Sequence, residues 1–114
     1  MTNELAKSIV DSSVRCTQAT LRAFGIEDAI PKTGSGCLEY LTSRGFTCLR
    51  MPAYEGITLK RLQQFPFKPN PNGQYLINTK GHAIALIDGI LIDTENKGFD
   101  NRSVEFCWIV QKVS

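Results

Sequence analysis

The stretch HAIALIDGILIDTE, residues 82–95, constrains the fold of this chain more than any other part of the sequence. Two apolar runs flank Asp88-Gly89, a dipeptide that favours the backbone conformation of a two-residue hairpin turn. A turn at this position pairs Ile87 with Ile90 and sets the register of all the other pairs, in which opposite side chains share a face. The stretch therefore predicts two adjacent antiparallel strands.

The rest of the chain divides into a helical part followed by strands. Further strands are predicted at FTCLRMP, GQYLINT and SVEFCWIVQKV, where Ile, Val and aromatic residues gather between Gly, Asn and Asp. A helix is predicted from an N-cap at Asp11 to Gly25, with shorter helices at CLEYLTSRGF and TLKRLQQFP. At 114 residues the chain suits one domain, 1–114. This order predicts an α+β fold, with N-terminal helices packed on a C-terminal antiparallel sheet.

The composition excludes several classes of function. The formal net charge is +2 with no dense block of Lys or Arg, so we expect no nucleic-acid partner. A weaker alternative, a basic edge at Lys60, Arg61, Lys68 and Lys80, is better explained by solvated side chains. No apolar run approaches the roughly 20 residues of a membrane span, and the first residues lack a signal peptide's apolar core. We expect a cytoplasmic protein without membrane contact.

The four cysteines predict neither a metal site nor a cofactor. They show no CxxC spacing, and in a reducing compartment they are expected to be free thiols. Cys48 and Cys107 fall in predicted strands and are expected in the core. Cys16 shares a stripe with Ala19 and Ala23, which predicts burial of its side chain where the helix lies close to the sheet.

His82 is the only histidine of the chain, and the hairpin register gives it acidic neighbours. In that register His82, Ile84, Asp93 and Glu95 share one face of the sheet. Asp93 is the diagonal neighbour of His82, and Glu95 lies directly opposite it. A carboxylate that orients an imidazole is the arrangement of a general base, so His82 with Asp93, or with Glu95, is a candidate catalytic pair.

A nucleophile for this base is expected at the start of a helix, where unpaired N–H groups and the helix dipole lower the pKa of a thiol. Two positions qualify. Ser12 follows the predicted N-cap Asp11, and Cys37 follows a glycine-rich stretch in TGSGCLEYL.

The motifs DSSVRC and GHAIALIDGILIDT, with the closing strand SVEFCWIV, resemble those of small phage and bacterial proteins with a papain-like cysteine hydrolase fold. Such proteins carry Asp-Cys-x-x-Arg at the start of the first helix, followed by a hairpin with the histidine and the aspartate. The resemblance implies a papain-like domain in which His82 is the base and Asp93 orients it. It matches Asp11 and Arg15 to the motif's acid and arginine, and it places Ser12 at the nucleophile position.

A serine at the nucleophile position departs from that motif, because a hydroxyl stays protonated where a thiol would ionise. Three explanations remain open: a Cys→Ser change made to silence the enzyme, which we favour; a natural descendant without activity; and a working nucleophile that is either Ser12 itself or Cys37.

The resemblance leads to two hypotheses of function. In the first, the chain is a papain-like cysteine hydrolase of a peptide, isopeptide or related acyl bond, inactivated at Ser12. Its substrate would be a protein or peptide, such as a host protein in the host cytoplasm if a phage encodes the chain. In the second, the chain is a non-catalytic binding protein with the same fold, such as a phage inhibitor of a host protein.

Overall fold

The computed structural model describes residues 1–27, 36–63, 70–94 and 101–113. The helices are α1 (Asn3–Ser12), α2 (Cys16–Ala23), α3 (Gly36–Ser43), the 3₁₀ helix η1 (Pro52–Tyr54) and α4 (Leu59–Leu62). The strands are β1 (Phe46–Arg50), β2 (Gln74–Thr79), β3 (His82–Ile87), β4 (Ile90–Ile92) and β5 (Phe106–Lys112). Two residues that the sequence singled out, Lys68 and Glu95, lie outside the described residues.

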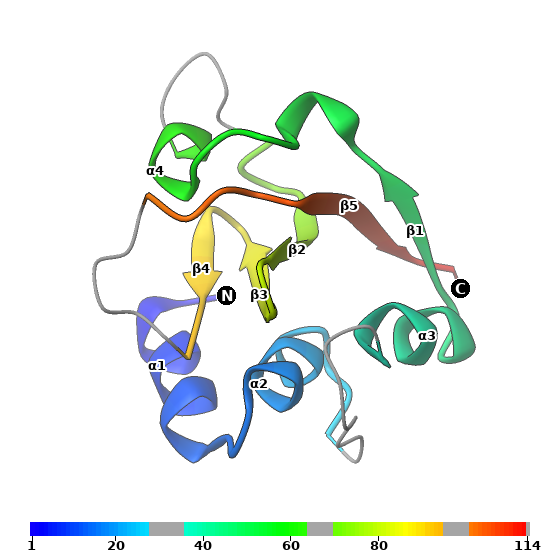
Figure 1. Cartoon of the computed structure of the whole chain (residues 1–114). Helices are drawn as coiled ribbons and strands as arrows, with labels where there is room; N and C mark the ends of the chain where they lie inside the picture. The colour runs from blue at the N-terminus through cyan, green and yellow to red at the C-terminus, as the bar shows by residue number, and fades with distance from the viewer. Residues whose placement is uncertain (28–35, 64–69, 95–100, 114) are drawn as a thin grey trace.

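The strands form one antiparallel sheet in the order β1-β5-β2-β3-β4 (Figure 1). The hairpin predicted at Asp88-Gly89 is confirmed, since Ile87 pairs with Ile90. Both turn residues have positive φ, 53° at Asp88 and 80° at Gly89. This is the conformation that a type I′ turn requires, and for which Asp and Gly are the favoured residues.

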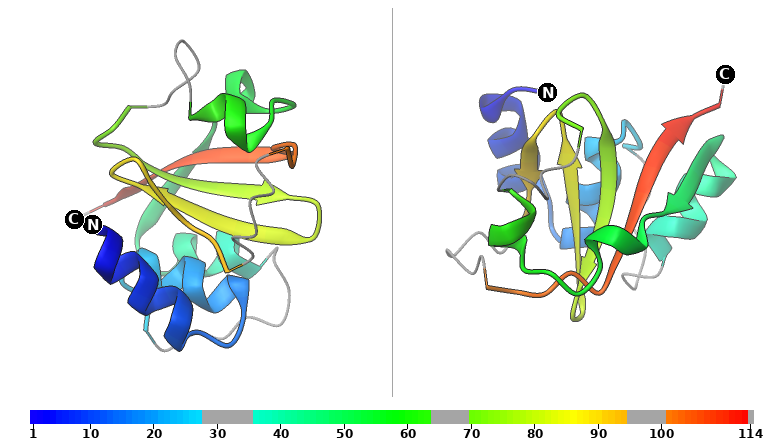
Figure 2. Two further views of the ribbon diagram at one scale, coloured as in Figure 1. Left: turned by 90° about the vertical axis from the view of Figure 1, so that its left-hand side faces the viewer. Right: turned by 90° about the horizontal axis from the view of Figure 1, so that it is seen from above.

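The sheet is covered on both faces (Figures 1 and 2). Buried residues of α1, α2 and α3 pack on one face against apolar side chains of β2, β3, β4 and β5. On the other face, Leu59 and Leu62 of α4 pack against residues of β2, β3 and β5. Every residue of β3 is buried, so this strand is covered on both faces. The mixed helical and antiparallel architecture expected from the sequence is confirmed.

The single helix predicted from Asp11 to Gly25 is wrong at its start. The structure has two helices here, because Ser12 and Ser13 end α1 instead of beginning a helix. Their hydroxyls donate hydrogen bonds to the carbonyl oxygens of Ser8 and Ile9, and Ser13 has an extended backbone. Serine hydroxyls can bond the carbonyl oxygen three or four residues earlier, as well as the N–H groups of a helix start. The predicted end at Gly25 is confirmed: α2 stops at Ala23, and Gly25 follows with a φ of 88°.

Small side chains bring α2 against the centre of the sheet. Ala19 of α2 is buried in the same cluster as Ala83 and Ala85 of β3. Small side chains on both elements let a helix and a strand approach closely, and α2 lies against β3. In the described part of the chain, no helix is long and apolar enough to cross a membrane.

Leu21→Ala should destabilise the protein by about 2–5 kcal/mol, because it leaves a cavity under α2 where Leu21 is now 0% exposed. Urea denaturation measures the change. Leu49→Ala is the matched control: Leu49 is 68% exposed, and its loss should alter stability by no more than about 0.5 kcal/mol. Equal effects at the two positions would contradict the assigned core.

Candidate active site

His82 and Asp93 form a buried pair at one end of the sheet. His82 is the first residue of β3, and Asp93 follows the last residue of β4. The imidazole Nε2 lies 2.7 Å from the carboxylate Oδ1, and the two residues are 6% and 7% exposed. The contact predicted from the hairpin register is therefore present. Its catalytic role stays a prediction, and the alternative acid Glu95 lies outside the described residues.

Cys16 is the first residue of α2 and lies against this pair. Its sulfur hydrogen-bonds the His82 side chain and accepts the backbone N–H groups of Ala83 and Thr17. Because Nε2 of His82 faces Asp93, the ring nitrogen left for the sulfur is Nδ1. A thiol, an imidazole and a carboxylate therefore follow one another in hydrogen-bonding contact. The prediction that Cys16 lies further inside the helix is wrong; the predicted burial is present in part, since the side chain is half-buried against the core.

The electrostatics of the site favour a charged pair. The hydrogen bond from His82 lowers the pKa of the Cys16 thiol, and the two backbone N–H groups act in the same direction against the effect of burial. The hydrogen bond to Asp93, followed by that to Cys16, raises the pKa of His82 to about 9. A thiolate beside an imidazolium is the reactive state of cysteine nucleophiles.

The other three cysteines lack this environment. Cys37 does lie at a helix start, as predicted, but it is 0% exposed and burial raises the pKa of its thiol to about 12. Burial likewise raises the pKa of Cys107 to about 12 and that of Cys48 above its ordinary value. Of the four cysteines, only Cys16 has a lowered pKa.

Ser12, the predicted nucleophile position, lies in a different setting. It is the last residue of α1, at the end where carbonyl oxygens rather than N–H groups are free. Its hydroxyl donates to the Ser8 carbonyl oxygen at 2.7 Å and accepts from the Arg22 guanidinium at 2.9 Å. None of the contacts described for Ser12 involves His82.

The neighbours of Ser12 also differ from their predicted roles. Asp11 is not an N-cap; its carboxylate binds Nζ of Lys7 at 2.6 Å on the same helix. Arg15 is the exposed N-cap residue of α2 and directly precedes Cys16. The helix-start motif of the resemblance therefore does not coincide with the helix start in the structure.

Arg102 also belongs to the site, although no sequence pattern selects it. Its guanidinium binds Oδ2 of Asp93, the oxygen that His82 does not use. Arg102 precedes β5 and lies in a polar stretch of the sequence. No periodic pattern of apolar residues there predicts a contact for it. Only the tertiary fold brings it to the carboxylate.

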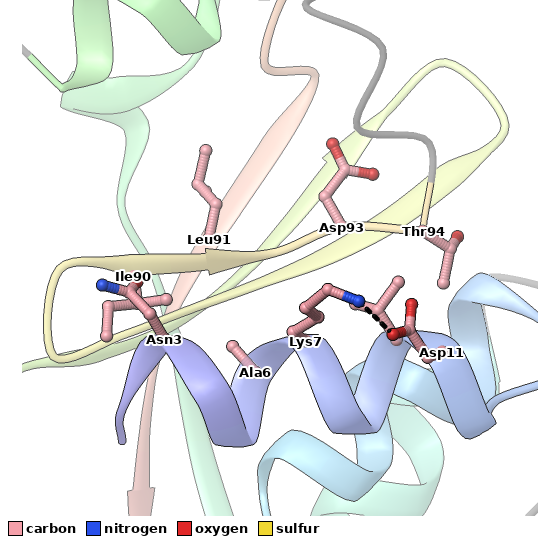
Figure 3. Close-up of a pocket in the computed structure, with 9 residues that line it drawn as sticks. Asn3, Ala6, Lys7, Asp11, Ile90, Leu91, Asp93 and Thr94 are labelled. Atoms are coloured by element: carbon pink, nitrogen blue, oxygen red, sulfur yellow. Dashed lines mark hydrogen bonds and ion pairs between the residues drawn. The ribbon is translucent and has the colours of Figure 1, made fainter.

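A cavity of about 460 Å³ opens between α1 and β4 and reaches Asp93. Figure 3 shows Thr94 and Ile90 directed toward α1, whereas Asp93 and Leu91 point to the other side of the strand. The ion pair between Lys7 and Asp11 lies on the helical wall. The cavity therefore borders Asp93 on the α1 side of β4, while the carboxylate itself lies on the other side of the strand.

Comparison of the chain with models of known families, with curated proteins and with solved structures gave no match. Among the described residues, no group of three or more His, Cys, Asp or Glu side chains could hold a metal ion. The chemistry open to the site is set by the geometry of Cys16, His82 and Asp93.

The His82 side chain should titrate near pH 9, since Asp93 and Cys16 stabilise its protonated form. NMR of the imidazole gives this value without ambiguity, because the chain has one histidine. In Asp93→Asn the pKa should fall toward 6.5, the ordinary value. A wild-type value near 6.5 would contradict the charged pair.

Iodoacetamide should alkylate Cys16 before the other cysteines, with a rate that rises with pH to a midpoint below the ordinary thiol value of 9.0. Mass spectrometry locates the label. His82→Ala should raise that midpoint and slow labelling at neutral pH, because the main cause of the lowered pKa is lost. Cys48, which is half-buried and has a raised pKa, is the internal control. Labelling of Cys48 as fast as Cys16 would contradict an activated thiol.

Proposed function

We propose that this protein is a cysteine-dependent hydrolase of peptide, isopeptide or related acyl bonds, with Cys16 as its nucleophile. One observation carries the proposal: a cysteine at a helix start contacts a buried imidazole whose other nitrogen binds a carboxylate. A nucleophile, a base and an orienting acid in this order of contacts are the groups that catalyse covalent acyl transfer.

Each residue has a defined step in the proposed reaction. The Cys16 thiolate attacks the carbonyl carbon, and the backbone N–H of Cys16, which has no intrahelical acceptor, faces the developing oxyanion. The His82 imidazolium gives its proton to the leaving group, and a thioester remains on Cys16. A water then attacks the thioester while His82 takes its proton, which releases the acid and restores the thiolate. Asp93 keeps the imidazole oriented throughout.

We further propose that the domain is papain-like. A cysteine at a helix start, a histidine at the start of a strand and an acid from the next strand occur here in that chain order. The resemblance seen in the sequence supports this through its hairpin motif, but its nucleophile moves from Ser12 to Cys16. With Cys16 as the nucleophile, no inactivating Cys→Ser change at position 12 has to be assumed. Ser12 then has the structural role of ending α1.

Cys16→Ala should abolish hydrolysis of p-nitrophenyl acetate beyond the background rate, and His82→Ala should lower it by roughly a hundredfold or more. Mass spectrometry of the quenched wild-type reaction should show one acetyl group, and digestion should place it on Cys16. Short peptide and isopeptide amides then define the natural bond class.

Two further variants keep the assignment testable. Cys48→Ser should behave as wild type, and Ser12→Ala should retain activity if Cys16 is the nucleophile. Loss of acyl transfer in Ser12→Ala, with Cys16→Ala still active, would restore the nucleophile predicted from the sequence. Absence of any acyl intermediate and of turnover would favour the non-catalytic binding protein.

A further inference from the structure

Arg102 lies on the far side of the acid from His82. Its guanidinium binds Oδ2 of Asp93, while Oδ1 of the same carboxylate binds His82. Asp93 is 7% exposed, and the Arg102 side chain is 21% exposed. The carboxylate therefore lies between two cationic groups, with one oxygen assigned to each.

The backbone around Arg102 is held in place by the segment before α4. The carbonyl oxygen of Arg102 accepts the N–H of Leu59 at 2.9 Å, and the N–H of Val104 binds the carbonyl oxygen of Ile57 at 2.8 Å. Leu59 and Val104 are each 1% exposed. The guanidinium is thus carried by a chain segment that is itself anchored in the core on the α4 face of the sheet.

We propose that Arg102 is a positioning residue of the site, which holds the Asp93 carboxylate in the orientation that keeps Oδ1 on His82 and thereby maintains the reactive state of Cys16. A charged hydrogen bond with planar geometry restricts the rotation of a carboxylate, and partners of this kind orient catalytic side chains. The consequence for catalysis rests on the proposed function; the consequence for His82 does not.

Charge alone and orientation alone predict opposite effects on His82. The positive charge of Arg102 disfavours a second cation nearby, so simple removal of that charge would raise the pKa of His82. Loss of the orienting contact would instead move the carboxylate off the imidazole and lower that pKa. The direction of the change therefore separates a positioning residue from a bystander charge.

The charged and titratable groups around the pair come from several elements. They are Cys16 of α2, Cys37 of α3 beyond it, Asp93 after β4, Arg102 before β5, and Lys7 and Asp11 of α1 across the cavity that Asp93 lines. Of these, Asp93 has the largest effect on His82, and Arg102 is the group that binds Asp93 from the other side.

The test is an NMR titration of His82 in Arg102→Gln and Arg102→Lys. We expect the pKa of His82 to fall from about 9 by roughly one unit or more in Arg102→Gln. The fall is expected because the Asp93 carboxylate would move off the imidazole, and a nearby opposite charge shifts a pKa by about that amount. Arg102→Lys keeps the charge without the planar fork and should give an intermediate value. Arg50→Gln is the matched control: it removes an arginine that pairs with Glu55 outside the site, and it should leave His82 unchanged.

The same variants are then assayed with iodoacetamide and p-nitrophenyl acetate. The midpoint for alkylation of Cys16 should rise, and kcat should fall with a smaller change in KM. An unchanged or raised pKa of His82 in a folded variant overturns the proposal. If Arg102→Gln does not fold, as its amide spectrum would show, Arg102→Lys decides. If wild type shows no turnover but the His82 shift occurs, the proposed function fails while the positioning role stands.

Discussion

The hydrogen bond between His82 and Asp93 is the interaction on which the rest of the site depends. A buried carboxylate is costly unless charged or hydrogen-bonding partners surround it, and here the imidazole and the Arg102 guanidinium supply them. The turn at Asp88-Gly89 makes the contact geometrically available, because it sets the register that places both residues at one end of the same hairpin. A single hairpin thus provides both the His82 base and the Asp93 carboxylate. Arg102, from outside the hairpin, balances the charge of that carboxylate.

The position of α2 adds a thiol to this pair. The helix begins close to β3, so that the backbone N–H groups of Thr17 in its first turn and of Ala83 in β3 both bond the sulfur of Cys16. The same residue in the middle of a helix would lack these donors and would be a small buried side chain. The difference between a structural and a reactive cysteine is here a matter of where a helix begins.

The sequence predicted the fold class and half of the site because both follow from local patterns. The Asp-Gly turn fixed the hairpin, and with it the contact of His82 with Asp93. The helix start predicted at Ser12 failed on capping: serine hydroxyls bond the carbonyl oxygens that end a helix as well as the N–H groups that start one, and the triplet Asp11-Ser12-Ser13 does not distinguish the two. Arg102 lies in a segment without periodicity, so only the folded chain could reveal its contact with Asp93.

The three residues of the site are unequally spaced along the chain. This spacing affects the order in which they come together during folding. His82 and Asp93 are 11 residues apart and meet as soon as one short hairpin closes, whereas Cys16 belongs to a helix from the far end of the sequence. Local hairpins close within microseconds, and long-range docking follows later. Nascent or partly unfolded chains would therefore carry an ordinary thiol at Cys16, and its pKa would fall only when α2 docks against His82, so that the completed fold itself sets the ionisation of this thiol.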